Sequence, residues 1–177
     1  MLAILAAATL GVTALPFTVN FSPSMPTGIY RTAPAAGALV RDDVIVVCPP
    51  VAAAEFARLR GYLGPGPCAP GTASLLKFVA AVSGDVVTAS PAGIRVNGRP
   101  LRNSAAFATD VRGRPLPHVP PRSYRLASGR LWLYAPFPRS WDSRYFGPVR
   151  ERDVRARAFL VLPIGDGAYV SRYGWGT

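Results

Sequence analysis

A single lysine stands among the basic residues of this chain. Of the twenty basic residues, nineteen are arginine and one is Lys77, which lies in the apolar run LLKFVAAV. An arginine keeps its proton at any accessible pH, whereas burial disfavours the charged form of a lysine and lowers its pKa. Lys77 is therefore a candidate general base. The alternative is a lysine whose stem lies on a sheet while its amine reaches water.

A lysine base requires a nucleophile, and the segment FSPSMPTGIY at residues 21–30 offers one. Ser24 lies between two prolines and just before Met25, as expected for a serine on a rigid turn. A serine with a lysine base is a known variant of the catalytic triad. A Ser-His-Asp triad would have to use the sole histidine, His118, which lies in the loop PLPHVPP and is better explained as a surface residue.

The first twenty residues, MLAILAAATLGVTALPFTVN, contain no charged side chain. As a helix, residues 2–19 would extend about 27 Å, close to the thickness of the hydrocarbon core of a bilayer. A cleavable signal peptide normally starts with a basic stretch, which is lacking here, and Pro16 argues against a core helix. We therefore expect a membrane anchor over residues 1–19 and one folded domain over residues 20–177, with a signal peptide as the alternative.

The composition predicts that the folded domain is mostly β. The 177 residues are half apolar and include 19 prolines and 17 glycines, which favours short strands joined by turns. Residues 102–123 are polar and proline-rich and are expected to form a mobile surface excursion. The expected elements are strands at 39–50, 74–82, 129–137 and 157–164, a hairpin at 85–101 with a turn at Asn97-Gly98, and a helix at 51–63 ended by Gly64-Pro65.

The net charge of +11 is compatible with nucleic acid or an anionic lipid surface as a partner. Because the arginines are scattered and no zinc-finger or RNA-binding motif is present, nucleic-acid binding is disfavoured. The spacing of Cys48 and Cys68 does not fit a zinc site. In an oxidising compartment this pair could form a disulfide that stabilises the fold by about 3 kcal/mol, and the alternative is two unrelated buried thiols.

Three segments resemble, in order, the sequence boxes of the serine–lysine signal (leader) peptidases. SPSMPTG resembles their nucleophile box, LLKFVAAVSGD their lysine box and SWDSRYFGPV their last box, with VNGRPL matching the Asn-Gly hairpin between the last two. The resemblance covers residues 1 to about 155. It implies a signal-peptidase-like antiparallel β catalytic domain on a single N-terminal transmembrane helix, with the helix in the bacterial inner membrane and the domain on the periplasmic side.

Two details resemble one branch of this family. The stretch YAPFPRSWDSR lacks the Gly-Asp-Asn that usually precedes the last box, and the serine box runs directly into PTGIYR. With the small size and single anchor, these features resemble the conjugative-transfer (TraF-like) peptidases, which process the pilin of a plasmid mating channel. The resemblance implies a serine endopeptidase that cleaves a pilin precursor and cyclises it when the pilin's own N-terminus is the acceptor. The alternatives are a general type I signal peptidase acting on exported proteins, a non-catalytic anchored β-domain and a DNA-contacting transfer component.

The resemblance also implies a role for each residue that matches a box. Ser24 would be the nucleophile and Lys77 its general base. The hydroxyl of Ser22 would bind the oxyanion together with the backbone N–H of Ser24. No metal or cofactor is implied, and the substrate would be a protein held in the same bilayer.

The last box would support this dyad. Ser140 matches a hydroxyl that orients the lysine amine. Asp142 and Arg144 match an ion pair that braces the site. The alternative for each of these three is a turn residue without a chemical part.

Overall fold

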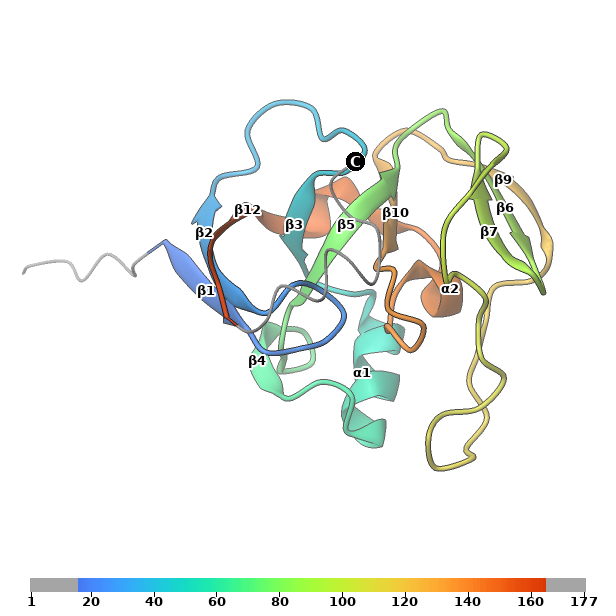
Figure 1. Cartoon of the computed structure of the whole chain (residues 1–177), viewed down its shortest axis with the longest axis horizontal. Coiled ribbons are helices and arrows are strands. Elements are labelled where there is room, and N and C mark those ends of the chain that lie inside the picture. Colours follow the sequence, from blue (N-terminus) through green and yellow to red (C-terminus); the bar gives the residue numbers. More distant parts are fainter. Residues whose placement is uncertain (1–15, 165–177) are drawn as a thin grey trace, which may run out of the picture.

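In the computed structural model, which describes residues 16–164, short antiparallel strands are the main regular structure (Figure 1). A seven-stranded sheet contains, from edge to edge, β1 (Phe17–Asn20), β2 (Gly28–Ala33), β12 (Val154–Pro163), β3 (Val44–Val47), β5 (Leu75–Ala81), β10 (Arg130–Tyr134) and β11 (Val149–Arg150). A four-stranded sheet contains β8 (Arg99–Pro100), β7 (Gly93–Val96), β6 (Val86–Ser90) and β9 (Arg122–Arg125). The remaining elements are α1 (Val51–Arg60), β4 (Pro65–Cys68), α2 (Ser143–Phe146) and the short 3-10 helix η1 (Glu151–Asp153). The prediction of a mostly β, antiparallel domain is confirmed.

The apolar run that was predicted to be an anchor over residues 1–19 ends in a strand. Phe17–Asn20 form β1, antiparallel to β2, and the Pro16 carbonyl accepts the Thr32 N–H at 2.6 Å. The predicted boundary at residue 19 is therefore wrong, because the proline interrupts the run and the Phe-Thr-Val that follows favours a strand. Residues 1–15 lie outside the described residues. No helix within residues 16–164 is long and apolar enough to cross a bilayer.

The predicted elements of the body of the chain are present with shifted bounds. Strands expected at 39–50, 74–82, 129–137 and 157–164 are β3, β5, β10 and β12, and the hairpin expected at 85–101 consists of β6, β7 and β8. The expected turn at Asn97-Gly98 is formed with φ values of 48° and 81°. Helix α1 ends earlier than predicted, because Gly61 adopts a left-handed φ of 74° and donates its N–H to carbonyls of the last turn.

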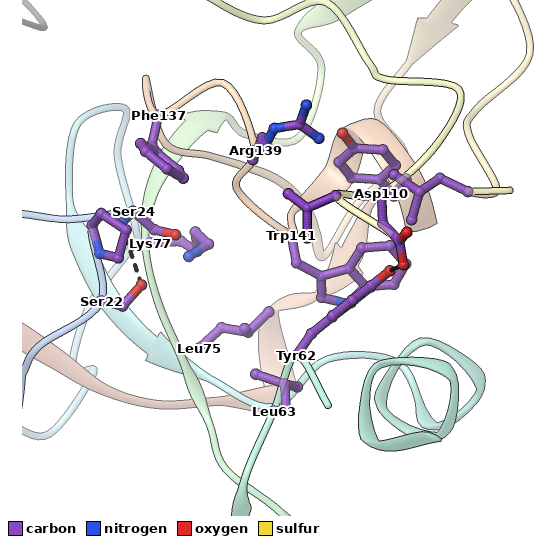
Figure 2. Close-up of a pocket in the computed structure, with 14 residues that line it drawn as sticks. Ser22, Ser24, Tyr62, Leu63, Leu75, Lys77, Asp110, Phe137, Arg139 and Trp141 are labelled. Carbon is purple, nitrogen blue, oxygen red and sulfur yellow. Dashed lines mark hydrogen bonds between the residues drawn. The ribbon is translucent and has the colours of Figure 1, made fainter. Parts of the chain in front are cut away.

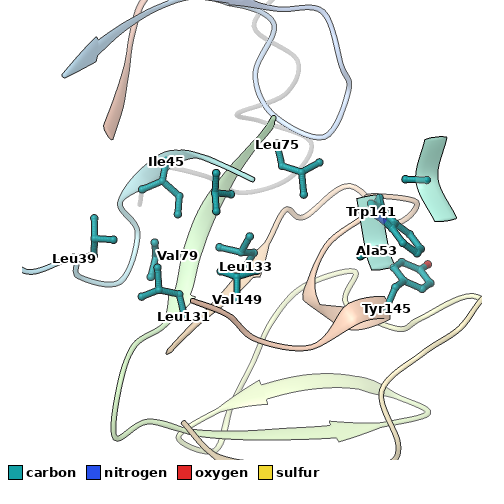
Figure 3. Packing of buried hydrophobic residues seen from close by; sticks show 12 residues of the cluster. Leu39, Ile45, Ala53, Leu75, Val79, Leu131, Leu133, Trp141, Tyr145 and Val149 are labelled. Atoms are coloured by element: carbon teal, nitrogen blue, oxygen red, sulfur yellow. The ribbon is translucent and has the colours of Figure 1, made fainter. Parts of the chain in front are cut away.

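Two apolar cores lie on opposite faces of β5 and β10. The main core packs α1 and α2 against the large sheet (Figure 3), and its centre includes Val79 and Leu133. Trp141 closes it, with its ring stacked on Phe56 and Tyr145 at centroid distances of 5.3 and 5.2 Å. The second core lies under the four-stranded sheet and includes Ala80, Trp132 and Tyr134. Because β5 is buried on both faces, its sequence reads as a continuous apolar run rather than an alternating one.

The segment 102–123 lies at the surface, as predicted, but several contacts tie it to the core. Asp110 accepts hydrogen bonds from the Tyr62 hydroxyl at 2.5 Å and from the Arg114 Nε at 2.7 Å. The Tyr145 hydroxyl accepts the Phe107 N–H at 3.2 Å. The expectation of a mobile excursion therefore does not fit these contacts, whose partners are distant in the sequence.

The structure joins Cys48 and Cys68 by a disulfide across a sequence separation of 20 residues. Cys48 directly follows β3, and Cys68 ends β4, so the bond ties the connection through α1 back to the large sheet. Both cysteines are buried. The fold therefore contains the covalent loop that the sequence allowed.

Replacing Cys48 and Cys68 together by alanine is expected to lower the free energy of unfolding by about 3 kcal/mol, because the unfolded chain regains the freedom of the closed loop. Urea unfolding of the full chain in detergent, followed by tryptophan fluorescence, measures this change. Reduction of the wild type should have a similar effect and should leave the double variant unchanged. A wild type whose stability is insensitive to reduction would contradict the prediction.

Candidate active site

The loop between β1 and β2 carries Ser24, which lies beside Lys77 of β5 (Figure 2). Met25, the next residue, is buried and packs with Phe78 of β5 and with Ala135, which follows β10. Phe78 in turn directly follows Lys77. This apolar contact therefore holds the two segments that carry Ser24 and Lys77 against one another.

Lys77 is buried in the middle of the large sheet, with 4% of its surface exposed. Side chains alternate along a strand, so Lys77 shares a face of β5 with Leu75 and Val79 of the main core. Burial lowers the pKa of its amine from the usual 10.5 to about 8, while the charge of Asp142 opposes this shift and that of Arg144 adds to it. The Nζ donates a hydrogen bond to the carbonyl of Leu76 at 3.1 Å. These surroundings favour the neutral amine.

Ser24 and Lys77 line the same pocket, which has a volume of about 290 Å³. Figure 2 shows the Ser24 hydroxyl and the Lys77 amine pointing toward one another on one side of this pocket. The opposite side is formed by Tyr62, Trp141 and Asp110, so the space extends well beyond the two reactive groups. An amine that can be neutral and a hydroxyl facing it are the two groups that a serine–lysine dyad needs.

Ser22 lies beside the nucleophile in the same loop. Its Oγ accepts the backbone N–H of Ser24 at 3.2 Å, and it also lines the pocket (Figure 2). The two groups predicted to bind an oxyanion are therefore adjacent, and the Ser22 hydroxyl keeps its own hydrogen for a further bond. In this structure the hydrogen of the Ser24 N–H is taken up by the Ser22 Oγ, so the two groups could donate to one further oxygen atom only after this hydrogen bond opens.

Ser140, the first residue of the last box, is fully buried at the end of the turn that follows β10. Its hydroxyl has no hydrogen-bond partner within residues 16–164. The hydrogen bond to the Lys77 amine that its predicted role requires is therefore not formed in this structure, since that amine donates to the Leu76 carbonyl. The role of Ser140 stays a prediction.

Asp142 and Arg144 form a fully buried ion pair next to the lysine strand. The Arg144 Nε and Nη2 donate to the two oxygens of Asp142, each at 2.8 Å, and neither side chain is exposed. The remaining donors of the guanidinium bind backbone carbonyls of Asn103, Ala135, Phe137, Pro138 and Ser140. A buried pair is costly unless its remaining hydrogen bonds are satisfied, and here backbone carbonyls satisfy them. These contacts are those of a brace between loops.

The sequence analysis missed several residues of the site. Tyr62, which follows α1, lines the pocket together with Arg139 and Trp141 of the turn after β10, and no spacing in the sequence connects Tyr62 with that turn. It also missed Asn20 and Tyr30, whose side chains bind carbonyls of the serine loop. The only signal was their position as polar or aromatic residues flanking the serine box.

Replacing Lys77 by methionine is expected to raise the free energy of unfolding by about 3 kcal/mol at pH 7, because the native state then no longer buries a charged amine. The figure follows from the pKa values of 10.5 in the unfolded chain and about 8 in the fold. The unfolded chain binds the proton more tightly, so the wild type gains stability as pH rises from 8 to 10.5. The difference between the two proteins should nearly vanish above pH 10.5.

Urea unfolding of both full-length proteins across this pH range tests the prediction. Subtracting the free energy of unfolding of the wild type from that of the variant at each pH cancels the contributions of the other titrating groups, which the two proteins share. If the difference in the free energy of unfolding between the two proteins were the same at pH 7 and above pH 10.5, the amine of Lys77 would not be desolvated.

Comparison with known proteins places this site in a family. The family "Signal peptidase, peptidase S26" matches residues 1–163. A probable conjugal transfer protein TraF of Sinorhizobium fredii is 35% identical over 147 residues, which cover 82% of this chain and 77% of that protein. A plasmid transfer protein TraF of Escherichia coli is 36% identical over 148 residues, covering 82% of this chain and 80% of that protein.

Among solved structures, a signal peptidase I of Enterococcus faecalis V583 aligns with a TM-score of 0.39 and 18% identity, over 68% of this chain and 97% of that chain. That overlap is too low to add to the family match. The match over residues 1–163 and the two TraF relatives are sufficient without it. The chain belongs to the signal peptidase family, peptidase S26, and is a serine peptidase.

Proposed function

We propose that this chain is a membrane-anchored serine endopeptidase in which Ser24 is the nucleophile and Lys77 its general base. The observation that carries the proposal is the buried amine of Lys77, with its pKa lowered to about 8, in the same pocket as Ser24. Such an amine is partly neutral near pH 8 and can take a proton from a hydroxyl. The arginines of the chain cannot do so.

In the acylation step, the Oγ of Ser24 attacks the carbonyl carbon of the scissile peptide bond while its proton moves to the neutral Nζ of Lys77. The carbon–nitrogen bond then breaks, and the protonated amine of Lys77 returns a proton to the leaving amine. In the second step, water or another amine attacks the acyl-enzyme, again with Lys77 as the base. The products are two peptides when water attacks and a new amide when an amine attacks.

The negative charge that develops on the carbonyl oxygen requires donors. The backbone N–H of Ser24 donates to the hydroxyl oxygen of Ser22 in this structure, and both groups would turn to that carbonyl oxygen when the substrate binds. Loss of one such donor typically costs about 2.7–4 kcal/mol in the barrier. The ion pair of Asp142 and Arg144 would not touch the substrate but would hold the turn after β10 next to the dyad.

The arrangement of the strands supports binding of the substrate in an extended conformation. Strand β10 pairs with β5 only at Phe78, Val79 and Ala81. On that side, β5 has no strand partner from Leu75 to Lys77 within the described residues. An extended peptide could therefore add to β5 beside Lys77 through main-chain hydrogen bonds.

The proposed substrate is a pilin precursor held in the same membrane, with the catalytic domain in the periplasm. The support is that the curated relatives are named as conjugal or plasmid transfer proteins TraF. Co-expression with a candidate pilin precursor, followed by mass spectrometry, tests this substrate and reports a linear cut, a cyclic product or neither. Cleavage of unrelated exported precursors instead would favour a general type I signal peptidase.

Replacing Lys77 by arginine, or Ser24 by alanine, should lower cleavage at least about 10²-fold, because arginine cannot give up its proton and alanine has no nucleophile. Cleavage of a precursor reporter by each full-length protein in membranes measures the effect. The matched controls are Arg130→Lys and Ser123→Ala, which change the same residue types at the surface and should cleave as the wild type does. Near-normal cleavage by either dyad variant would end the assignment.

The rate of cleavage should also depend on the protonation of Lys77. Because its folded pKa is about 8, kcat/KM should fall about tenfold per pH unit below pH 8 and level off above it, where the amine is neutral. A pH series with a soluble peptide substrate and detergent-solubilised enzyme measures this profile. A rate that is constant from pH 6 to 9 would point to another base.

A further inference from the structure

One side chain binds four polar backbone groups of the loop that carries Ser24. The loop lies outside the described strands. The Nδ2 of Asn20, the last residue of β1, donates to the carbonyls of Ser22 at 2.9 Å, Met25 at 3.0 Å and Pro26 at 3.1 Å. Its Oδ1 accepts the N–H of Ser22 at 3.1 Å. Asn20 therefore holds the chain on both sides of Ser24.

These contacts allow only one orientation of the amide. Carbonyl oxygens only accept and a backbone N–H only donates, so the amide nitrogen must face the three carbonyls. An amide nitrogen has two hydrogens, so at least one of them is shared between two carbonyls. Asn20 is 9% exposed, so water has little access to replace it. No shorter or charged side chain offers the same combination of donors and acceptor.

The hydrogen bonds of Asn20 do not involve the hydroxyl groups of Ser22 and Ser24. Asn20 binds the backbone N–H and carbonyl of Ser22 but not its hydroxyl, which lies 3.2 Å from the backbone nitrogen of Ser24. The hydroxyl of Ser24 is likewise no part of this set of bonds. The side chain of Asn20 thus fixes the backbone of the loop while the groups that would act on a substrate remain on its other side.

We infer that Asn20 is a positioning residue of the peptidase, which fixes the nucleophile of Ser24 and the two adjacent oxyanion donors relative to Lys77. The inference rests on the proposed function of this site. Asn20 acts through the loop and does not touch the substrate. Displacement of a reacting group by about 1 Å can lower a rate on the order of 10²-fold, so the effect on catalysis should exceed the effect on folding.

Other contacts would keep the loop folded without Asn20. The Tyr30 hydroxyl donates to the carbonyl of Pro26 at 2.7 Å, and the side chain of Met25 is buried against Phe78. These two contacts hold the end of the loop, and the Met25 N–H donates weakly to the Ser22 carbonyl at 3.4 Å, while Asn20 binds both the N–H and the carbonyl of Ser22 next to the nucleophile. A variant of Asn20 should therefore remain folded with a loosened nucleophile.

The test compares Asn20→Asp and Asn20→Ala with the wild type, each as the full chain. The aspartate has nearly the same size and keeps the acceptor but removes both donor hydrogens. For both variants, kcat should fall on the order of 10²-fold while KM changes less than about threefold. In Asn20→Ala, the midpoint of the pH profile should stay near 8, because this change adds no charge near Lys77.

Asn97→Ala is the matched control. The Asn97 side chain also binds backbone and side-chain groups of a turn, namely the Val86 N–H and the Asp85 carboxylate, but in the four-stranded sheet. This variant should lose stability and keep its kcat. If the role of Asn20 were only structural, its variants would behave like this control. They would show a reduced folded fraction and an unchanged kcat per folded molecule, and that result would overturn the inference.

Amide hydrogen exchange separates this inference from the proposed function. Exchange in the peptide covering residues 20–28 should be faster in both Asn20 variants, whether or not a substrate is cleaved. Unchanged exchange in this peptide would overturn the inference and leave the peptidase assignment intact. Wild-type cleavage by Ser24→Ala would instead overturn the proposed function.

Discussion

The burial of one amine is the constraint on which the rest of the site depends. Lys77 can be neutral near pH 8 only because apolar residues cover both faces of β5. Asp142 would by itself favour the protonated amine, and a base beside an uncompensated carboxylate would be a poor one. Arg144 offsets this effect, because it binds both oxygens of Asp142 and adds its own charge near the amine. The ion pair is therefore compatible with a neutral lysine, which Asp142 alone would disfavour.

The same guanidinium connects the site to the rest of the fold. Its carbonyl partners lie in the turn after β10 and, at Asn103, in the segment 102–123. That segment is also held by Asp110 at the far side of the pocket. A segment that composition predicts to be mobile is thus fixed at Asn103 and at Asp110 by buried or half-buried polar contacts. The shape of the pocket depends on these contacts as much as on its apolar lining.

Residue type alone was sufficient to single out Lys77 and Ser24, because a lone lysine in an apolar strand and a serine between prolines are local features. The strands and the Asn97-Gly98 turn also follow local rules and were found within a few residues. The strand at the end of the apolar N-terminal run was missed, although Pro16 interrupts the run and the Phe-Thr-Val that follows favours a strand. The contact between Met25 and Phe78 joins residues that are far apart in sequence and depends on the topology of the sheet.

A side chain, rather than a neighbouring strand, binds the backbone of the loop that carries Ser24. A strand neighbour would pair with the backbone N–H of Ser24, which the proposed chemistry needs for the oxyanion, and would occupy the edge of β5 where a peptide could add. The carbonyls of the loop nevertheless need donors, because unpaired buried polar groups are destabilising. An amide supplied from inside, at the end of β1, satisfies those carbonyls and leaves the pocket side open. The strand β1 is therefore part of the site, because its pairing with β2 sets where that amide lies.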